Sequence, residues 1–233
     1  MSRVYADNNA TTPIEPAVID AMQVFFTERF YNPAAISGQA NSIHIDIAKS
    51  RRIVSEFLGA SDPAEITFTS CATESNNWAI FGALRANKSR RHIITSTVEH
   101  PSILETIKTL GNDGYDVTFI EVDRSGKLDL NSLFDSIRSD TNIISLMAAN
   151  NETGVIFPVK EISEEIKQRD ANIIFHTDGT QYIGKFPINL KNDFQFIDLL
   201  VDGGWWTGVG GLGLVDGGWW TGVGPRQVHE MIQ

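Results

Sequence analysis

Polar residues that could bind a charged ligand gather in four short clusters of the sequence. They are residues 70–77 (SCATESNN), Glu99 with His100, residues 149–152 (ANNE) and residues 176–181 (HTDGTQ). Each cluster follows a segment with the pattern of a strand. Because ligands bind beyond the carboxyl ends of the strands in a parallel sheet, the four clusters together predict one shared site. Turns and helix caps also place Ser, Thr, Asn and Asp at strand ends, so the specificity lies in the combination.

The first cluster combines small side chains with the predicted start of a helix. Free backbone N–H groups and hydroxyls at a helix N-terminus can bind a phosphate. The same residues can equally form an ordinary cap, with Thr73 as the capping residue and Glu74 favoured by the positive end of the helix. No glycine-rich phosphate loop occurs in the sequence, so an ATP-type site is not indicated.

The other three clusters contain side chains suited to a flat, charged ligand. His100 can transfer protons or stack on a ring, or it can be a surface or capping histidine. Asp178 follows the apolar run 173–175 (IIF), and a carboxylate leaving a buried strand needs a partner. That partner can be the protonated ring nitrogen of pyridoxal 5′-phosphate (PLP), an arginine or a helix cap. Gln181 and Asn151 can donate to a phenolate or a substrate carboxylate, or can satisfy backbone groups.

Composition narrows the classes of function. The 233 residues include 19 Lys and Arg against 29 Asp and Glu, and this net charge of −10 argues against nucleic acid or an anionic membrane as the main partner. The sequence has no run of about 18 apolar residues, no signal-peptide core and no GxSxG elbow. His92, His100 and His176 lack the spacing of metal ligands, so no metal is expected. The single cysteine, Cys71, fits a reducing cytoplasm.

Helical and strand patterns alternate along residues 1–200, and these elements must position the clusters. Helices are predicted at 16–30, 39–58, 73–86, 101–110, 130–138 and 159–169. Strands are predicted at 65–69, 92–96, 117–122, 142–147 and 172–176. Strands separated by helices of this length predict βαβ units, and therefore an α/β fold with a mostly parallel sheet.

Residues 201–224 form a segment of different character. The sequence LVDGGWWTGVG occurs at 200–210 and again at 214–224, and residues 201–224 hold ten of the 19 glycines. Glycine at this density opposes helix and strand interiors. The repeat can be a tryptophan-lined binding loop or a non-native tail, and the identity of the two copies favours the tail.

Six motifs occur in the order found in one enzyme family. They are DNNATTP (7–13), YNPAA (31–35), EITFTSCATESNN (65–77), IITSTVEH (93–100), NNETG (150–154) and HTDGTQYIGK (176–185). In these motifs the chain resembles the NifS/IscS-like cysteine desulfurases of the class-V aminotransferase family, from about Tyr5 to Leu199. The resemblance implies the large domain of a PLP-dependent transferase of fold type I, with a mixed, mainly parallel sheet and helices on both faces. It also implies that the C-terminal small domain of the family is missing. The domain boundaries expected are 1–200 for the large domain, 201–224 for the repeat and 225–233 for a tail.

The resemblance implies a role for each cluster in binding PLP. Ala72 and Thr73 look like the residues that hold the PLP phosphate at a helix start. His100 resembles the histidine that stacks on the pyridine ring and takes part in proton transfer. Asp178 resembles the aspartate paired with the ring nitrogen, and Gln181 resembles the hydrogen-bond partner of the ring hydroxyl.

The family's reaction takes sulfur from L-cysteine, and Asn151 resembles the asparagine near the ring hydroxyl and the substrate carboxylate. In that reaction L-cysteine joins PLP, a separate cysteine thiolate takes the sulfur as a persulfide, and alanine is released. The resemblance further implies an iron–sulfur scaffold or another sulfur-acceptor protein as partner, and a homodimer.

The sequence departs from the family at the lysine that forms the Schiff base with PLP. Counted from Asp198, that position falls at about Trp206, and no lysine follows Lys191. Tryptophan has no amine and cannot form an imine. Lys185, in the GK motif, is expected to be a surface or turn lysine. Cys71 is not expected to be the persulfide-forming cysteine, which the family carries in the missing domain.

These departures lead us to expect a cysteine desulfurase-type, PLP-binding domain that is inactive by itself. One alternative is a PLP-binding or scaffold-interacting protein without turnover. The other is a misassembled fragment that exposes apolar surface.

Overall fold

The computed structural model describes residues 4–7, 9–203 and 212–216, the last five by their backbone alone. Its strands are β1 (Ile66–Phe68), β2 (His92–Ser96), β3 (Asp116–Ile120), β4 (Thr141–Ser145), β5 (Ile174–Asp178), β6 (Leu199–Val201) and β7 (Leu212–Asp216). Its helices are α1 (Pro16–Thr27), α2 (Gly38–Leu58), α3 (Ala72–Ala86), α4 (Pro101–Asn112), α5 (Leu130–Asp135) and α6 (Val159–Arg169), with a short 3₁₀ turn at Pro63–Glu65.

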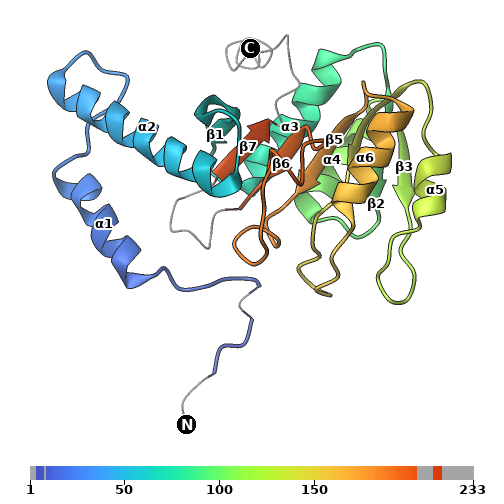
Figure 1. The fold of residues 1–233 in the computed structure, drawn as a ribbon, viewed down its shortest axis with the longest axis horizontal. Helices are drawn as coiled ribbons and strands as arrows, with labels where there is room; N and C mark the ends of the chain where they lie inside the picture. The colour runs from blue at the N-terminus through green and yellow to red at the C-terminus, as the bar shows by residue number, and fades with distance from the viewer. Residues whose placement is uncertain (1–3, 8, 204–211, 217–233) are drawn as a thin grey trace.

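The described strands form one mixed sheet in the order β1-β7-β6-β5-β4-β2-β3 (Figure 1). The five strands from β6 to β3 run parallel to one another, whereas β7 is antiparallel to both β6 and β1. The predicted α/β fold with a mainly parallel sheet is confirmed. In such a sheet the central strands β5 and β4 are hydrogen-bonded on both sides, and their carboxyl ends meet at one edge.

Helices cover both faces of the sheet, as expected, because adjacent apolar residues of each central strand point to opposite sides. In one core, side chains of β2, β4 and β5 pack with α2, α5 and α6. The residues that these strands contribute to it are Ile94, Ile144 and Phe175. In the other core, the preceding residue of each of these strands packs with α3 and α4. These residues are Ile93, Ile143 and Ile174.

The N-terminal helices lie to one side of these layers. Figure 1 shows α1 standing apart from the sheet, whereas α2 reaches the sheet near β1. None of the residues of α1 is buried. Ser37 caps α2 by accepting a hydrogen bond from the Ala40 N–H at 3.1 Å. Gly59 ends α2 with φ +68°, the left-handed conformation that favours glycine.

Two strands were not predicted, and β5 ends later than predicted. β5 continues to Asp178 because β6 pairs with its last three residues, with Asp178 opposite Val201. β7 lies inside the glycine-rich segment, so the prediction that its glycine density opposes strands is wrong for residues 212–216. Of those five residues only Gly213 is a glycine, and both of its neighbouring strands supply hydrogen-bonding partners.

Candidate functional site

Asp178 is the last residue of β5 and lies at the centre of the sheet. Its carboxylate is buried and accepts a hydrogen bond from Asn76 Nδ2 at Oδ2 (2.9 Å) and one from the Thr180 N–H at Oδ1 (3.0 Å). The backbone is held on both sides, since the Asp178 carbonyl accepts from the Ala148 N–H and the Gly179 N–H donates to Val201. The β-sheet therefore fixes a negative charge at the carboxyl edge of its central strand.

A chain of hydrogen bonds connects this carboxylate to His100. Asn76, on α3 and fully buried, also donates through Nδ2 to Ser102 Oγ at 2.9 Å. Ser102 lies in the first turn of α4, and both its N–H (3.1 Å) and its hydroxyl (2.9 Å) contact His100 Nδ1. Since Asn76 donates to the Ser102 oxygen, the Ser102 hydrogen is left for Nδ1. Nδ1 then accepts two hydrogen bonds, which leaves Nε2 as the ring nitrogen that carries a hydrogen.

The start of α3 brings together the residues of the first polar cluster. Ala72 is the first residue of the helix, and Thr73, in its first turn, is exposed. Thr73 is not the cap, because Cys71 occupies that position. The Ser70 N–H and hydroxyl both donate to the Glu74 carboxylate, at 2.6 and 2.5 Å. The Glu74 N–H and the Ser70 hydroxyl lower the pKa of the exposed Cys71 thiol.

Asn9 joins the two remaining predicted residues into a third group. Its side-chain amide donates to the Asn151 carbonyl at 3.2 Å, and its own carbonyl accepts from Gln181 Nε2 at 3.1 Å. Lys185 Nζ donates to Asn9 Oδ1 at 3.1 Å and to Gln181 Oε1. The N-terminal segment, which carries the DNNATTP motif, therefore contacts the ends of two strands far from it in sequence.

Two buried titratable residues lie next to these groups. Glu99, which precedes His100, accepts from the Ser96 hydroxyl (2.5 Å) and the Met147 N–H (3.0 Å) at one carboxyl oxygen. Burial raises its pKa to about 8. His176 is fully buried on β5, where burial lowers its pKa to about 4, and its Nδ1 contacts Ser145 Oγ at 2.8 Å. At neutral pH the Glu99 carboxyl is therefore protonated and the His176 ring is neutral.

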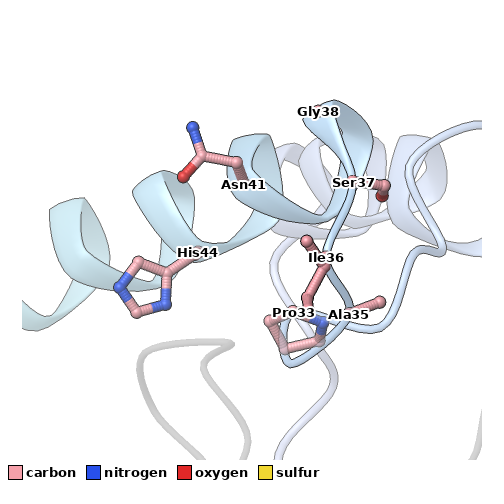
Figure 2. Close-up of a pocket in the computed structure, with 7 residues that line it drawn as sticks. All are labelled: Pro33, Ala35, Ile36, Ser37, Gly38, Asn41 and His44. Atoms are coloured by element: carbon pink, nitrogen blue, oxygen red, sulfur yellow. The ribbon is translucent and has the colours of Figure 1, made fainter.

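A hollow of about 450 Å³ lies elsewhere, at the start of α2 (Figure 2). It is lined by the YNPAA motif and the first turns of the helix, with residues Pro33, Ala35, Ile36, Ser37, Gly38, Asn41 and His44. None of the residues predicted to bind a cofactor lines it. No helix in the described part of the chain is long and apolar enough to cross a membrane. Residues 4–7, 9–203 and 212–216 contain no group of three acidic, His or Cys side chains that could hold a metal ion.

The aminotransferase class-V family model matches residues 4–215, which is most of the chain. The chain belongs to the class-V aminotransferase family.

Within the class-V aminotransferases, the chain is similar to cysteine desulfurases. It is 44% identical over 192 residues to cysteine desulfurase NifS of Azotobacter vinelandii, covering 82% of this chain and 47% of the relative. It is 44% identical over 198 residues to cysteine desulfurase IscS of Methanosarcina thermophila, covering 84% and 48%. The chain thus spans about half the length of the curated relatives it matches.

Solved structures agree with this class-V aminotransferase fold. A NifS-like protein superposes with a TM-score of 0.86 at 37% identity, covering 92% of this chain and 59% of that one. A structure described as SspA in complex with cysteine superposes with a TM-score of 0.83 at 34% identity, covering 90% and 60%.

The class-V aminotransferase family implies PLP as cofactor, and the Asp178 site offers groups that fit it. Among the buried polar atoms that have no hydrogen-bond partner in the described residues are Asn76 Oδ1, Thr177 Oγ1 and Thr180 Oγ1, on or beside this site. Since an unpaired buried polar atom costs free energy, they favour a polar ligand over an apolar one. A buried carboxylate, a neighbouring histidine and a helix N-terminus match the ring nitrogen, the ring and the phosphate of PLP.

Sequence reasoning singled out Asp178, His100, Gln181 and Asn151 but not the residues that contact them, Asn76 and Asn9. Asn76 and Asn9 lie inside recognised motifs, although nothing in their spacing distinguishes them from their polar neighbours. The expected position of the missing lysine, near Trp206, lies outside the described residues.

Proposed function

We propose that this chain is the PLP-binding part of a cysteine desulfurase, a PLP-dependent enzyme that takes sulfur from L-cysteine and releases alanine. The observation that carries the proposal is the hydrogen-bonded connection from Asp178 through Asn76 and Ser102 to His100. The similarity to cysteine desulfurases at 44% identity supports the same reading.

In this proposal Asp178 pairs with the protonated ring nitrogen of PLP. The Asn76 amide and the Thr180 N–H orient the two carboxylate oxygens, so the charge is held in place before a ligand arrives. When bound, PLP supplies an electron sink for negative charge that develops on the substrate. His100 stacks on the ring and presents its Nε2 hydrogen, because Ser102 fixes Nδ1 as an acceptor.

The other groups bind the two remaining edges of the ring. The backbone N–H groups of Ala72 and Thr73 at the start of α3 hold the phosphate, where the helix dipole favours a negative charge. Gln181 bonds the ring hydroxyl, and Asn151 lies near that hydroxyl and the substrate carboxylate. L-cysteine as substrate is supported by the neighbour described as being in complex with cysteine.

We propose that the chain alone does not turn over L-cysteine. No lysine follows Lys191, and Cys71 is the only thiol in the sequence. Cys71 occupies the N-cap position of α3, beside the N–H groups proposed to hold the phosphate, so a sulfur carrier there would compete with the cofactor. The proposal extends to a homodimer, to an iron–sulfur scaffold or other sulfur-acceptor protein as partner, and to the cytoplasm as compartment. We also propose that the large domain ends at residue 200.

Equilibrium dialysis with pyridoxamine 5′-phosphate, which has the ring and phosphate of PLP but no aldehyde, tests the site without requiring a covalent bond. Wild type is expected to retain it, and Asp178→Asn to bind about tenfold more weakly, because one charge-assisted hydrogen bond is lost. Asp193→Asn, an exposed carboxylate paired with Lys160, is the matched control and is expected to bind like wild type. Equal binding by wild type and Asp178→Asn would contradict the proposal. Alanine formed from L-cysteine above the level given by free PLP would contradict the lack of turnover.

A further inference from the structure

Lys185 lies inside the group of polar residues proposed to bind the hydroxyl edge of the PLP ring. Its Nζ donates to Gln181 Oε1 and to Asn9 Oδ1, and Asn9 in turn contacts the Asn151 carbonyl. The Lys185 amine is thus bonded directly to Gln181, a predicted cofactor-binding residue. It is linked through Asn9 to Asn151, another predicted cofactor-binding residue. Lys185 is exposed and lies in a turn, as expected for the GK motif, and from this turn its side chain reaches these residues.

Other lysines of the chain are held by carboxylates away from this site. Lys108 pairs with Glu105 on α4, and Lys160 pairs with Asp193. Lys167 pairs with the largely buried Asp198, which also accepts from the Phe175 N–H of β5. Two of the acceptors of Lys185 are the amide oxygens of Asn9 and Gln181. The nearest lysine in sequence, Lys191, has its backbone N–H bonded to Gly59 at the end of α2.

The position of this amine matters because of the shape of the PLP ring. The ring hydroxyl and the reactive aldehyde are on adjacent ring carbons, so a ring whose hydroxyl contacts Gln181 places its aldehyde next to the groups that contact Gln181. We propose that Lys185 is the residue that attaches PLP covalently to this chain, a proposal that rests on the PLP site proposed above. The Lys185 nitrogen adds to the aldehyde carbon, the carbonyl oxygen leaves as water, and a carbon–nitrogen double bond remains.

The surroundings of Lys185 suit this addition, which requires the neutral amine. Although Lys185 is exposed, partial desolvation of its amine lowers its pKa, so a larger share of the amine is neutral than for a lysine in free solution. Hydrogen bonds to Gln181 Oε1 and Asn9 Oδ1 position the Lys185 nitrogen without modifying it. Attachment by Lys185 would keep PLP bound to a chain that has no lysine after Lys191.

The test labels the full chain with equimolar PLP, reduces the product with borohydride and maps the modified lysines by peptide mass spectrometry. Lys185 is expected to carry about tenfold more label than Lys191, because only Lys185 is held at the ring. Lys185→Arg is expected to lose most of the total label, whereas the matched variant Lys191→Arg retains it. Circular dichroism of both variants checks that they fold like wild type.

Binding of pyridoxamine 5′-phosphate to the same variants separates the two proposals. If this analogue binds in an Asp178-dependent way and the label still spreads evenly over several lysines, or is absent, the assignment of Lys185 is wrong and the PLP site stands. If the analogue does not bind and the labelling is nonspecific, both proposals fail. Label concentrated on Lys185 together with Asp178-dependent binding supports both.

Discussion

Replacing Glu99 by glutamine tests whether the carboxyl beside His100 is protonated in the folded protein. Glu99 is 4% exposed, and one of its oxygens accepts from Ser96 and Met147 while the other has no partner among the described residues. Glutamine keeps the accepting oxygen and never ionises. Because it mimics the protonated carboxyl, Glu99→Gln is expected to match the stability of wild type within about 1 kcal/mol at about pH 5.

The magnitude follows from the difference in pKa between the unfolded and folded chain. Burial raises the Glu99 pKa from 4.5 to about 8, so the folded protein keeps a proton that the unfolded chain releases. Stability is therefore unaffected below about pH 4.5, falls as the pH rises to about 8, and is constant above it. At about 1.4 kcal/mol for each pH unit, wild type is expected to lose about 4 kcal/mol relative to Glu99→Gln between about pH 5 and pH 9.

Urea unfolding followed by far-ultraviolet circular dichroism measures this difference at each pH. Comparing two variants at the same pH cancels the other titrating groups, including His176. Glu105→Gln is the matched control, since this side chain is 69% exposed on α4 and its change should stay within about 1 kcal/mol of wild type at every pH. A difference between wild type and Glu99→Gln that does not change with pH would refute the reasoning, because Glu99 would then ionise equally well in both states.

Three further substitutions test local features of the fold by the same unfolding assay. Ser37→Ala removes the cap of α2 and is expected to cost about 1 kcal/mol, with Ser37→Asp restoring most of it; an unchanged midpoint would mean that the cap contributes nothing. Asn76→Ala leaves the Asp178 carboxylate and Ser102 without their donor and is expected to cost about 2 to 3 kcal/mol, and also to weaken pyridoxamine 5′-phosphate binding; intact binding would argue against the connection to His100. Gly203→Ala places a Cβ 2.6 Å from Thr180 Cγ2 and is expected to cost about 1 to 3 kcal/mol, which the additional change Thr180→Ser, lacking that methyl, should partly recover.

The central strands and their helices could be predicted from the sequence because their patterns are strong. β2 and α6 have the predicted bounds, since β2 contains the β-branched residues Ile93, Ile94 and Thr95 and α6 has its apolar residues on one face. β6 could not be predicted, because it has only three residues and runs directly into the repeat. Its position depends on pairing with β5, which is a tertiary contact rather than a local preference.

The candidate site was predictable as a set of clusters but not as a set of contacts. Asp178 and His100 follow strands, which is visible in the sequence. Asn76 is 102 residues from Asp178, and a polar residue buried within a helix looks the same in the sequence as one on its surface. Glu99 was grouped with His100 for its position, but its raised pKa depends on burial that only the assembled sheet provides.

The contacts of Asn9 have a consequence for the order in which the chain folds. Asn9 bonds to residues 142, 172 and 176 positions later, at Asn151, Gln181 and Lys185. Asn9 therefore lacks these three partners until the chain through Lys185 has been made and β4 and β5 are in place. Contacts of such long range form late, because closing the loop costs entropy before any contact forms. The contacts of Asn9 are thus expected among the last to form, and proteolysis before α1 should slow once they have formed.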